Sequence, residues 1–239
     1  MKATLCLLSI LVAATMLAAV PLSILHTNDT HGIYLPQKTK SGAMVGGYAA
    51  LEYYLNKERS AAPRSMYLDA GDQQTGSVFA SMNYNGAIGG AVIKTFNYLK
   101  PDAATFGNHE FDQSYANTLR LTELADYPFV STNLITKQDK HLGGNPYRIV
   151  TLDSLKVAIM GLTLTELPEK VKIENVKDLN ILPYKAALEQ YLDKADAESD
   201  LVVLLTHIGF EADSLLAASL DSRVDIIIGG HSHVSIDEP

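Results

Sequence analysis

Short apolar runs that end abruptly in aspartate, asparagine or histidine recur along the chain, and this recurrence constrains the fold more than any other feature. The run LSILHT at 22–27 leads into Asp29 and His31, and MYLDAGD leads into Asp72. Apolar runs of this length, bounded by polar residues and glycine, indicate buried strands, so each polar group falls where a strand ends. Later runs end in the other polar groups, which are Asn108 with His109 and Asp112, then His207, then His231 with His233.

Segments with helical periodicity separate these runs. The alternation is typical of an α/β fold. The segments 135–145 and 167–180 are polar or weakly periodic, and we interpret them as surface connections. Strands are predicted at 22–27, 65–70, 102–106, 129–133, 147–152, 156–162, 200–206 and 224–229, and helices at 48–60, 86–99, 113–125, 184–197 and 212–220.

The C-terminal ends of strands in an open α/β sheet face one crevice where ligands bind. Five predicted strands therefore bring their polar groups to one edge, and an extended backbone would point Asp29 and His31 the same way. A single histidine there is more often a capping or solvent-facing residue. Together the groups predict a divalent metal site, because cations neutralise polarity that is costly to bury. Five of the seven histidines take part, whereas His26 and His141 do not.

Length and charge narrow the possible functions. The chain has 239 residues, 47% of them hydrophobic, which is enough to bury a sizeable core. Its formal net charge is -8. An acidic protein of this kind is not expected to hold macromolecular nucleic acid by surface electrostatics, so any phosphate groups it handles require local cations.

The N-terminus predicts an export signal over residues 1–20. A lysine at position 2 precedes an uncharged apolar run from Ala3 to Val20, and cleavage near Ala18 or Ala19 would fit the small-residue rule. The alternative is an uncleaved membrane anchor. Cys6, the only cysteine, lies in this segment, so the mature chain offers a metal only nitrogen and oxygen ligands. We expect the mature protein in the periplasm or outside the cell.

Five blocks, TNDTHG, DAGDQQTGS, GNHEFD, LLTHIG and GGHSH, resemble the ordered signature of the calcineurin-like metallophosphoesterases. They extend from Ile24 to His233, and the first and third are most similar to the branch of 5'-nucleotidases, UDP-sugar hydrolases and 2',3'-cyclic nucleotide phosphodiesterases. The resemblance implies a four-layer α/β/β/α sandwich as the catalytic domain, over 21–239. Members of this branch continue further, so we expect the last strands of the sandwich and the C-terminal nucleotide-specificity domain to be absent.

The resemblance also implies two divalent metal ions and their ligands. Imidazole groups suit zinc, manganese, iron or cobalt, and the two oxygens of a carboxylate allow Asp72 to bridge both ions. By motif position, Asp29, His31, Asp72 and His233 would hold one ion, and Asp72, Asn108, His207 and His231 the other.

The same motifs imply a catalytic pair formed by His109 and Asp112. His109 would lie beside the phosphoryl group with Asn108, both binding substrate, and would protonate the leaving oxygen while a metal-activated hydroxide attacks phosphorus. Asp112 would orient the imidazole. The alternative for Asp112 is a capping residue at a helix turn.

Three functions remain open at this level. The first is an exported phosphohydrolase acting on nucleotide phosphomonoesters, and the second a phosphodiesterase or pyrophosphatase acting on cyclic nucleotides or UDP-sugars. The third is a non-catalytic metal-binding fragment, which would have no need of an acid pair. Two positions depart from the nucleotidase pattern: His233 replaces the frequent Gln or Asn, and Ser114 replaces a glycine.

Overall fold

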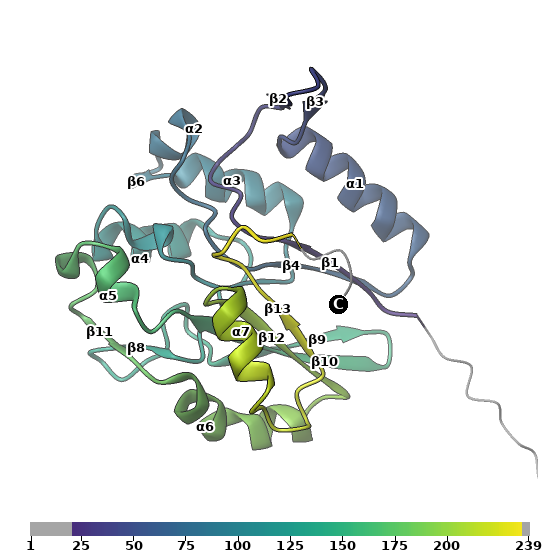
Figure 1. Cartoon of the computed structure of the whole chain (residues 1–239), viewed down its shortest axis with the longest axis vertical. Helices are drawn as coiled ribbons and strands as arrows, with labels where there is room; N and C mark the ends of the chain where they lie inside the picture. Colours follow the sequence, from purple (N-terminus) through teal and green to yellow (C-terminus); the bar gives the residue numbers. More distant parts are fainter. Residues whose placement is uncertain (1–20, 236–239) are drawn as a thin grey trace, which may run out of the picture.

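Two β-sheets face each other in the computed structural model, which describes residues 21–235, and helices cover their outer sides (Figure 1). The predicted export segment 1–20 lies outside the described residues. The first sheet is parallel, in the order β1 (Ser23–Thr27), β4 (Ser65–Asp69), β7 (Ala103–Ala104). The second has the order β13 (Ile226–Ile228), β12 (Leu201–His207), β10 (Leu155–Thr163), β9 (Tyr147–Leu152), with only β9 antiparallel among them.

Alternate residues of the central strands belong to two different apolar clusters. Leu68 of β4 and Ile159 of β10 lie in one cluster, made by residues of both sheets. Their chain neighbours Tyr67 and Met160 lie in the other, which includes the helices. Each central strand is therefore buried on both faces, which explains why its sequence is an unbroken apolar run. The predicted four-layer α/β/β/α sandwich is confirmed.

The helices are amphipathic segments packed on the sheets. On the first sheet lie α1 (Tyr48–Ala61), α3 (Gly90–Leu99) and α4 (Tyr115–Leu124), and on the second α6 (Tyr184–Ala197) and α7 (Phe210–Ala217) (Figure 1). Ser114 is the N-cap of α4, where its hydroxyl accepts a hydrogen bond from the N–H of Asn117 at 3.1 Å. A serine thus suits this position. None of the helices formed by residues 21–235 has the length and apolar composition needed to cross a membrane.

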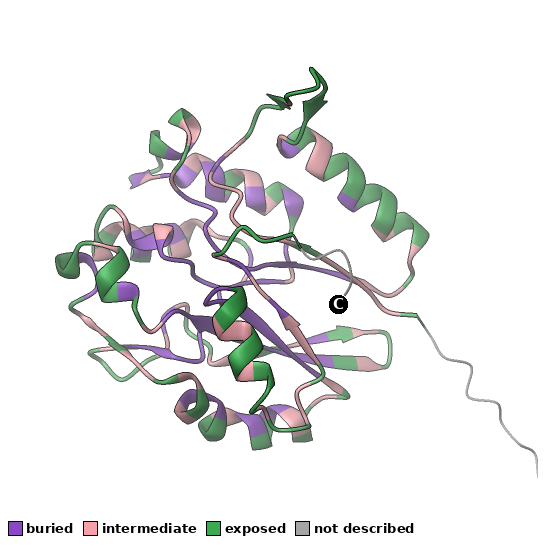
Figure 2. Cartoon of the chain, in the orientation of Figure 1, coloured by how far each residue is buried: buried purple, intermediate pink, exposed green. Residues whose placement is uncertain are grey.

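Shorter elements complete the fold. Figure 2 shows that the hairpin of β2 and β3 is exposed, whereas the central strands are buried. These elements are β2 (Gln37–Lys38), β3 (Met44–Val45), α2 (Val78–Ser81), β5 (Asn83–Tyr84), β6 (Ala87–Ile88), the 3-10 helix η1 (His109–Phe111), β8 (Leu134–Thr136), α5 (Leu167–Lys170), the 3-10 helix η2 (Ile173–Asn175) and β11 (Leu179–Ile181).

The strand predicted at 129–133 is wrong, because this segment crosses from one sheet to the other. The N–H of Val130 bonds to the carbonyl of Ala104 in β7, and the N–H of Thr132 bonds to the carbonyl of Gly161 in β10. The carbonyl oxygen of Val130 lies so close to Gly161 that a Cβ there would be 2.1 Å from it. The apolar composition of segment 129–133 reflects its burial between the sheets rather than regular strand pairing.

Two further predictions need correction. The helix predicted at 86–99 begins only at Gly90, because Gly86 and Gly89 have φ angles of 83° and 82°, which interrupt a right-handed helix.

The segment 167–180 is more than a surface connection. It contains α5 and η2, and its residues Leu167 and Val176 are buried in the core.

Candidate metal centre

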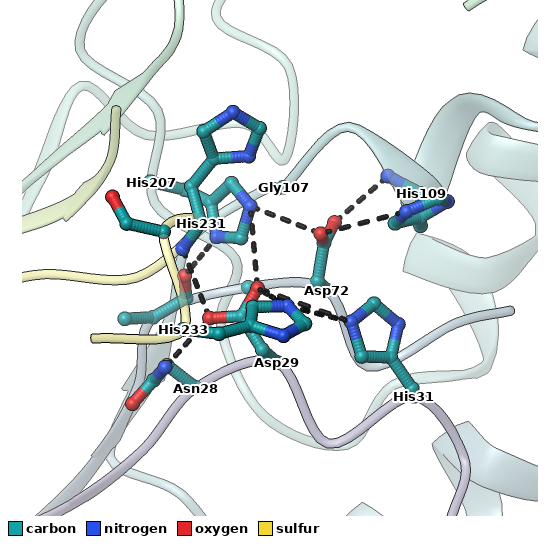
Figure 3. Close-up of polar contacts among 12 residues, drawn as sticks. Asn28, Asp29, His31, Asp72, Gly107, His109, His207, His231 and His233 are labelled. Atoms are coloured by element: carbon teal, nitrogen blue, oxygen red, sulfur yellow. Dashed lines mark hydrogen bonds and ion pairs between the residues drawn. The ribbon is translucent and has the colours of Figure 1, made fainter. Parts of the chain in front are cut away.

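The loops that follow four strands meet at one point between the sheets. Asp29 and Asp72 follow β1 and β4 of the first sheet, whereas His207 ends β12 and His231 follows β13 of the second (Figures 1 and 3). The predicted convergence of strand ends is confirmed. It joins two facing sheets, however, and is not the edge of one open sheet.

Left-handed backbone conformations aim the side chains into this centre. The predicted extended backbone between Asp29 and His31 is wrong, because both residues have a φ of 49°. Hydrogen bonds from their N–H groups to the carbonyls of Gly71 and Asp72 hold the loop beside the loop after β4. Such conformations are uncommon outside glycine and cluster at functional sites. They recur at Asp72, His231 and His233, with φ of 55°, 81° and 52°.

Asp29 is fixed through one carboxylate oxygen and leaves the other free. Its Oδ2 accepts hydrogen bonds from Nδ2 of Asn28 at 2.6 Å and from the N–H of His231 at 2.9 Å. Its Oδ1 has no hydrogen-bond partner. The Nε2 atoms of His233 and His31 lie 3.2 Å and 4.0 Å from this oxygen (Figure 3).

Asp72 is held in the same manner. Its Oδ1 accepts the N–H of His109 at 2.8 Å, and its Oδ2 lies 3.1 Å from Nε2 of His207, without the alignment of a hydrogen bond. The Nδ1–H of His207 donates to the carbonyl of Ala70 at 2.6 Å, so Nε2 is the ring nitrogen that faces the carboxylate. Burial lowers the pKa of His207, but Asp72 outweighs burial and raises it to about 9.

The donor set fits bound metal ions. Among the residues that the structure describes, three buried side-chain atoms lack a hydrogen-bond partner: Asp29 Oδ1, Asn108 Oδ1 and His207 Nε2. Unpartnered buried polar atoms are costly unless a ligand satisfies them. All three are predicted metal ligands. In three groups the possible ligand atoms lie within 4.8 Å of one another: Asp29 with His31 and His233, Asp72 with His207 and His231, and His31 with Asp72 and His109.

His109 lies at the rim of the centre and is paired with Asp112. The Nδ1–H of His109 donates to Oδ2 of Asp112 at 2.6 Å, and its Nε2 lies 4.0 Å from Oδ2 of Asp72. The hydrogen bond to Asp112 raises the pKa of His109. Asp112 thus orients an imidazole and does not cap the 3-10 helix η1 through its side chain.

Sequence reasoning missed Glu110, although it lies between two predicted residues. Its buried carboxylate accepts hydrogen bonds from the N–H groups of Asp72 at 3.0 Å, Gln73 at 2.8 Å, Gln74 at 3.2 Å and Gly107 at 2.6 Å. These bonds join the loop that carries Asp72 to the turn that carries His109. Nothing in the sequence pattern shows these contacts, because they join residues up to 38 positions apart.

We expect Glu110→Gln to destabilise the fold by about 2 kcal/mol, because the amide NH2 would replace an acceptor and leave buried N–H groups without a partner. Urea unfolding of the metal-free protein measures the change. The matched control is Glu123→Gln, whose side chain is 63% exposed and pairs with Arg120. Equal unfolding free energies for the two variants would contradict the role given to Glu110.

The two histidines outside the predicted site also lie outside it in the structure. His26 is exposed on β1. His141 is satisfied on both ring nitrogens, with Nδ1 bonded to the carbonyl of Ser131 and Nε2 to the hydroxyl of Tyr191, each at 2.7 Å. Neither is available to the centre.

Known proteins share this fold and much of this sequence. The 5'-nucleotidase of Bos taurus is 33% identical over 226 residues, which cover 89% of this chain and 38% of that protein. The NAD 5'-nucleotidase of Haemophilus influenzae is 31% identical over 226 residues, which cover 90% of this chain and 36% of that protein.

Solved structures agree with these relatives. The structure of the Haemophilus influenzae NAD nucleotidase matches with a TM-score of 0.76 and 30% identity, over 89% of this chain and 38% of that chain. A 5'-nucleotidase precursor from Thermus thermophilus matches with a TM-score of 0.77 and 29% identity, over 90% of this chain and 43% of that chain. This chain spans about two fifths of the length of such relatives.

The family described as calcineurin-like phosphoesterase matches residues 22–235, which include every residue of the centre. The match agrees with the two-sheet fold and with the cluster of aspartate, asparagine and histidine side chains between the sheets. The chain therefore belongs to the calcineurin-like phosphoesterase family.

Proposed function

We propose that this chain is a metal-dependent phosphoric ester hydrolase that acts on nucleotide phosphomonoesters. The observation that carries the proposal is the set of three unpartnered buried atoms, on Asp29, Asn108 and His207, beside the pair of His109 and Asp112. The relatives named 5'-nucleotidases support the choice of substrate class.

The residues divide into two ligand sets that share Asp72. Asp29, His31 and His233 would complete one set, and Asn108, His207 and His231 the other. Divalent cations held there supply positive charge to the phosphoryl group and lower the pKa of a water molecule. Zinc, manganese, iron or cobalt suits such a nitrogen and oxygen donor set.

His109 is the proton donor of the proposed reaction. Its Nδ1–H is bound to Asp112, so Nε2 is the nitrogen left to face a substrate. A protonated imidazole held in this way can give the Nε2 proton to the leaving oxygen. We propose that Asn108 and His109 also contact the phosphoryl oxygens, since both begin the turn after β7.

The test is phosphate release from AMP compared with nitrophenol release from bis(p-nitrophenyl) phosphate, with added Mn²⁺ or Zn²⁺. We expect release from AMP that stops when EDTA removes the metal. Cleavage of the diester alone would instead support a phosphodiesterase acting on cyclic nucleotides or UDP-sugars. No turnover of either compound by metal-loaded protein would contradict the proposal and favour a non-catalytic metal-binding role.

A further inference from the structure

Thr75 has a backbone conformation that its side chain disfavours. Its φ is 64°, in the left-handed region. Among residues 21–235, it is the only β-branched residue with a positive φ, since the other such residues besides glycine are Asp, Asn, His or Lys. A β-branched residue in this region is a genuine outlier, and such strain persists where the surrounding structure imposes it.

The surrounding contacts show what holds Thr75 there. The N–H groups of Gln73 and Gln74 are bound to the carboxylate of Glu110, and the carbonyl of Gln74 lies 3.2 Å from Nδ1 of His31. On the other side, Gly76 packs so closely on His31 that a Cβ at position 76 would be 2.8 Å from the His31 Cβ. The loop is thus fixed on both sides of Thr75, between the centre and the turn after β7.

The hydroxyl of Thr75 contacts the catalytic pair directly. Its Oγ1 donates a hydrogen bond to Oδ2 of Asp112 at 2.6 Å, and this same oxygen accepts the Nδ1–H of His109 at 2.6 Å. The side chain of Asp112 is 24% exposed. The terminal torsion of an aspartate is soft, so a carboxylate reached by solvent needs a second contact to keep one orientation.

We propose that Thr75 is a positioning residue that fixes the Asp112 carboxylate, so that His109 keeps Nε2 directed at the leaving oxygen of the substrate. This inference rests on the proposed function, and it adds a third member to the pair of His109 and Asp112. Thr75 itself would touch neither substrate nor metal.

The step that Thr75 serves is proton delivery. Hydrolysis breaks the bond between phosphorus and the leaving oxygen, whose electron pair stays on that oxygen, and forms a bond from phosphorus to the oxygen of water. The Nε2 proton of His109 neutralises the leaving oxygen, and a proton released by the water restores His109. A ribose alkoxide needs this proton, whereas p-nitrophenolate is a stable anion that does not.

The test compares Thr75→Val, which keeps the shape but removes the hydroxyl, with Thr75→Ser, which keeps the hydroxyl. With Mn²⁺ bound, we expect Thr75→Val to lower kcat on AMP roughly tenfold, as loss of an orienting partner does, and to leave kcat on p-nitrophenyl phosphate within about twofold. Thr75→Ser is expected to restore turnover of AMP. The matched control is Thr122→Val on α4, a half-buried residue whose hydroxyl bonds only to the carbonyl of Leu119 in its own helix.

A second measurement does not depend on activity. In ¹⁵N-edited NMR spectra of the metal-free protein, we expect Thr75→Val to move the ring resonances of His109 and to leave those of His141 in place. His141 is a suitable internal reference, because Ser131 and Tyr191 hold its ring away from the centre.

The outcomes separate the two proposals. Unchanged His109 resonances in Thr75→Val, or an equal loss on both substrates, would overturn the positioning role. If Thr75→Val shifts the His109 resonances but the wild-type chain hydrolyses neither substrate, the hydrogen bond of Thr75 would be supported and the proposed function contradicted.

Discussion

Replacing Asp72 by alanine is expected to abolish turnover of AMP. The variant is also expected to be unable to bind two metal ions at once. The Oδ2 atom of Asp72 faces His207 at 3.1 Å, and its Oδ1 holds the N–H of His109 at 2.8 Å. Asp72 is also the residue common to both proposed ligand sets. Since bound metal supplies several kcal/mol of charge stabilisation to a phosphoryl transfer, we expect a loss of roughly 10³-fold or more in kcat/KM.

Metal analysis and thermal unfolding check this result. The wild-type protein is expected to gain stability when Mn²⁺ or Zn²⁺ is added, by about 2.7 kcal/mol at a concentration a hundred times the Kd, because the ion binds only the folded state. Asp72→Ala is expected to lose most of this gain. The control is Asp153→Ala, an exposed carboxylate paired with Arg64. Two tightly bound ions in Asp72→Ala would contradict the bridging role.

The central strands and most helices could be predicted because each has a local cause in the sequence. Helix α6 is predicted at 184–197 and is found at Tyr184–Ala197, and β12 is predicted at 200–206 and found at Leu201–His207. Burial on both faces gives such strands unbroken apolar runs, and one buried face gives the helices their periodicity. The segment 129–133 shares the apolar composition without the pairing, so composition alone misleads there.

The members of the centre could be predicted, but their geometry could not. Asp29 and His31 meet in the same cluster as expected, although through left-handed backbone and not through an extended strand. The contacts of Glu110 and Thr75 join two loops that the folding of the first sheet brings together. Local hydropathy carries no information on such contacts. The proposed metal ligands are different in kind, because the order of the sequence motifs is enough to predict them.

His109→Ala tests the proposed proton donor at the rim of the centre. The variant removes the proposed proton donor, whose Nδ1–H binds Asp112 at 2.6 Å, but it removes none of the proposed metal ligands. We therefore expect two bound ions, as in the wild-type protein, and a fall in kcat on AMP of roughly a hundredfold or more, which is typical for loss of a general acid.

A comparison of two leaving groups distinguishes a role of His109 as a general acid from a role as a metal ligand. As an acid it matters less for p-nitrophenyl phosphate than for AMP, because p-nitrophenolate departs without a proton. His109 also lies in a possible ligand group with His31 and Asp72, so loss of one ion in His109→Ala would assign it to metal binding. The exposed His26→Ala is the matched control, and a His109→Ala variant as active as this control would contradict both roles.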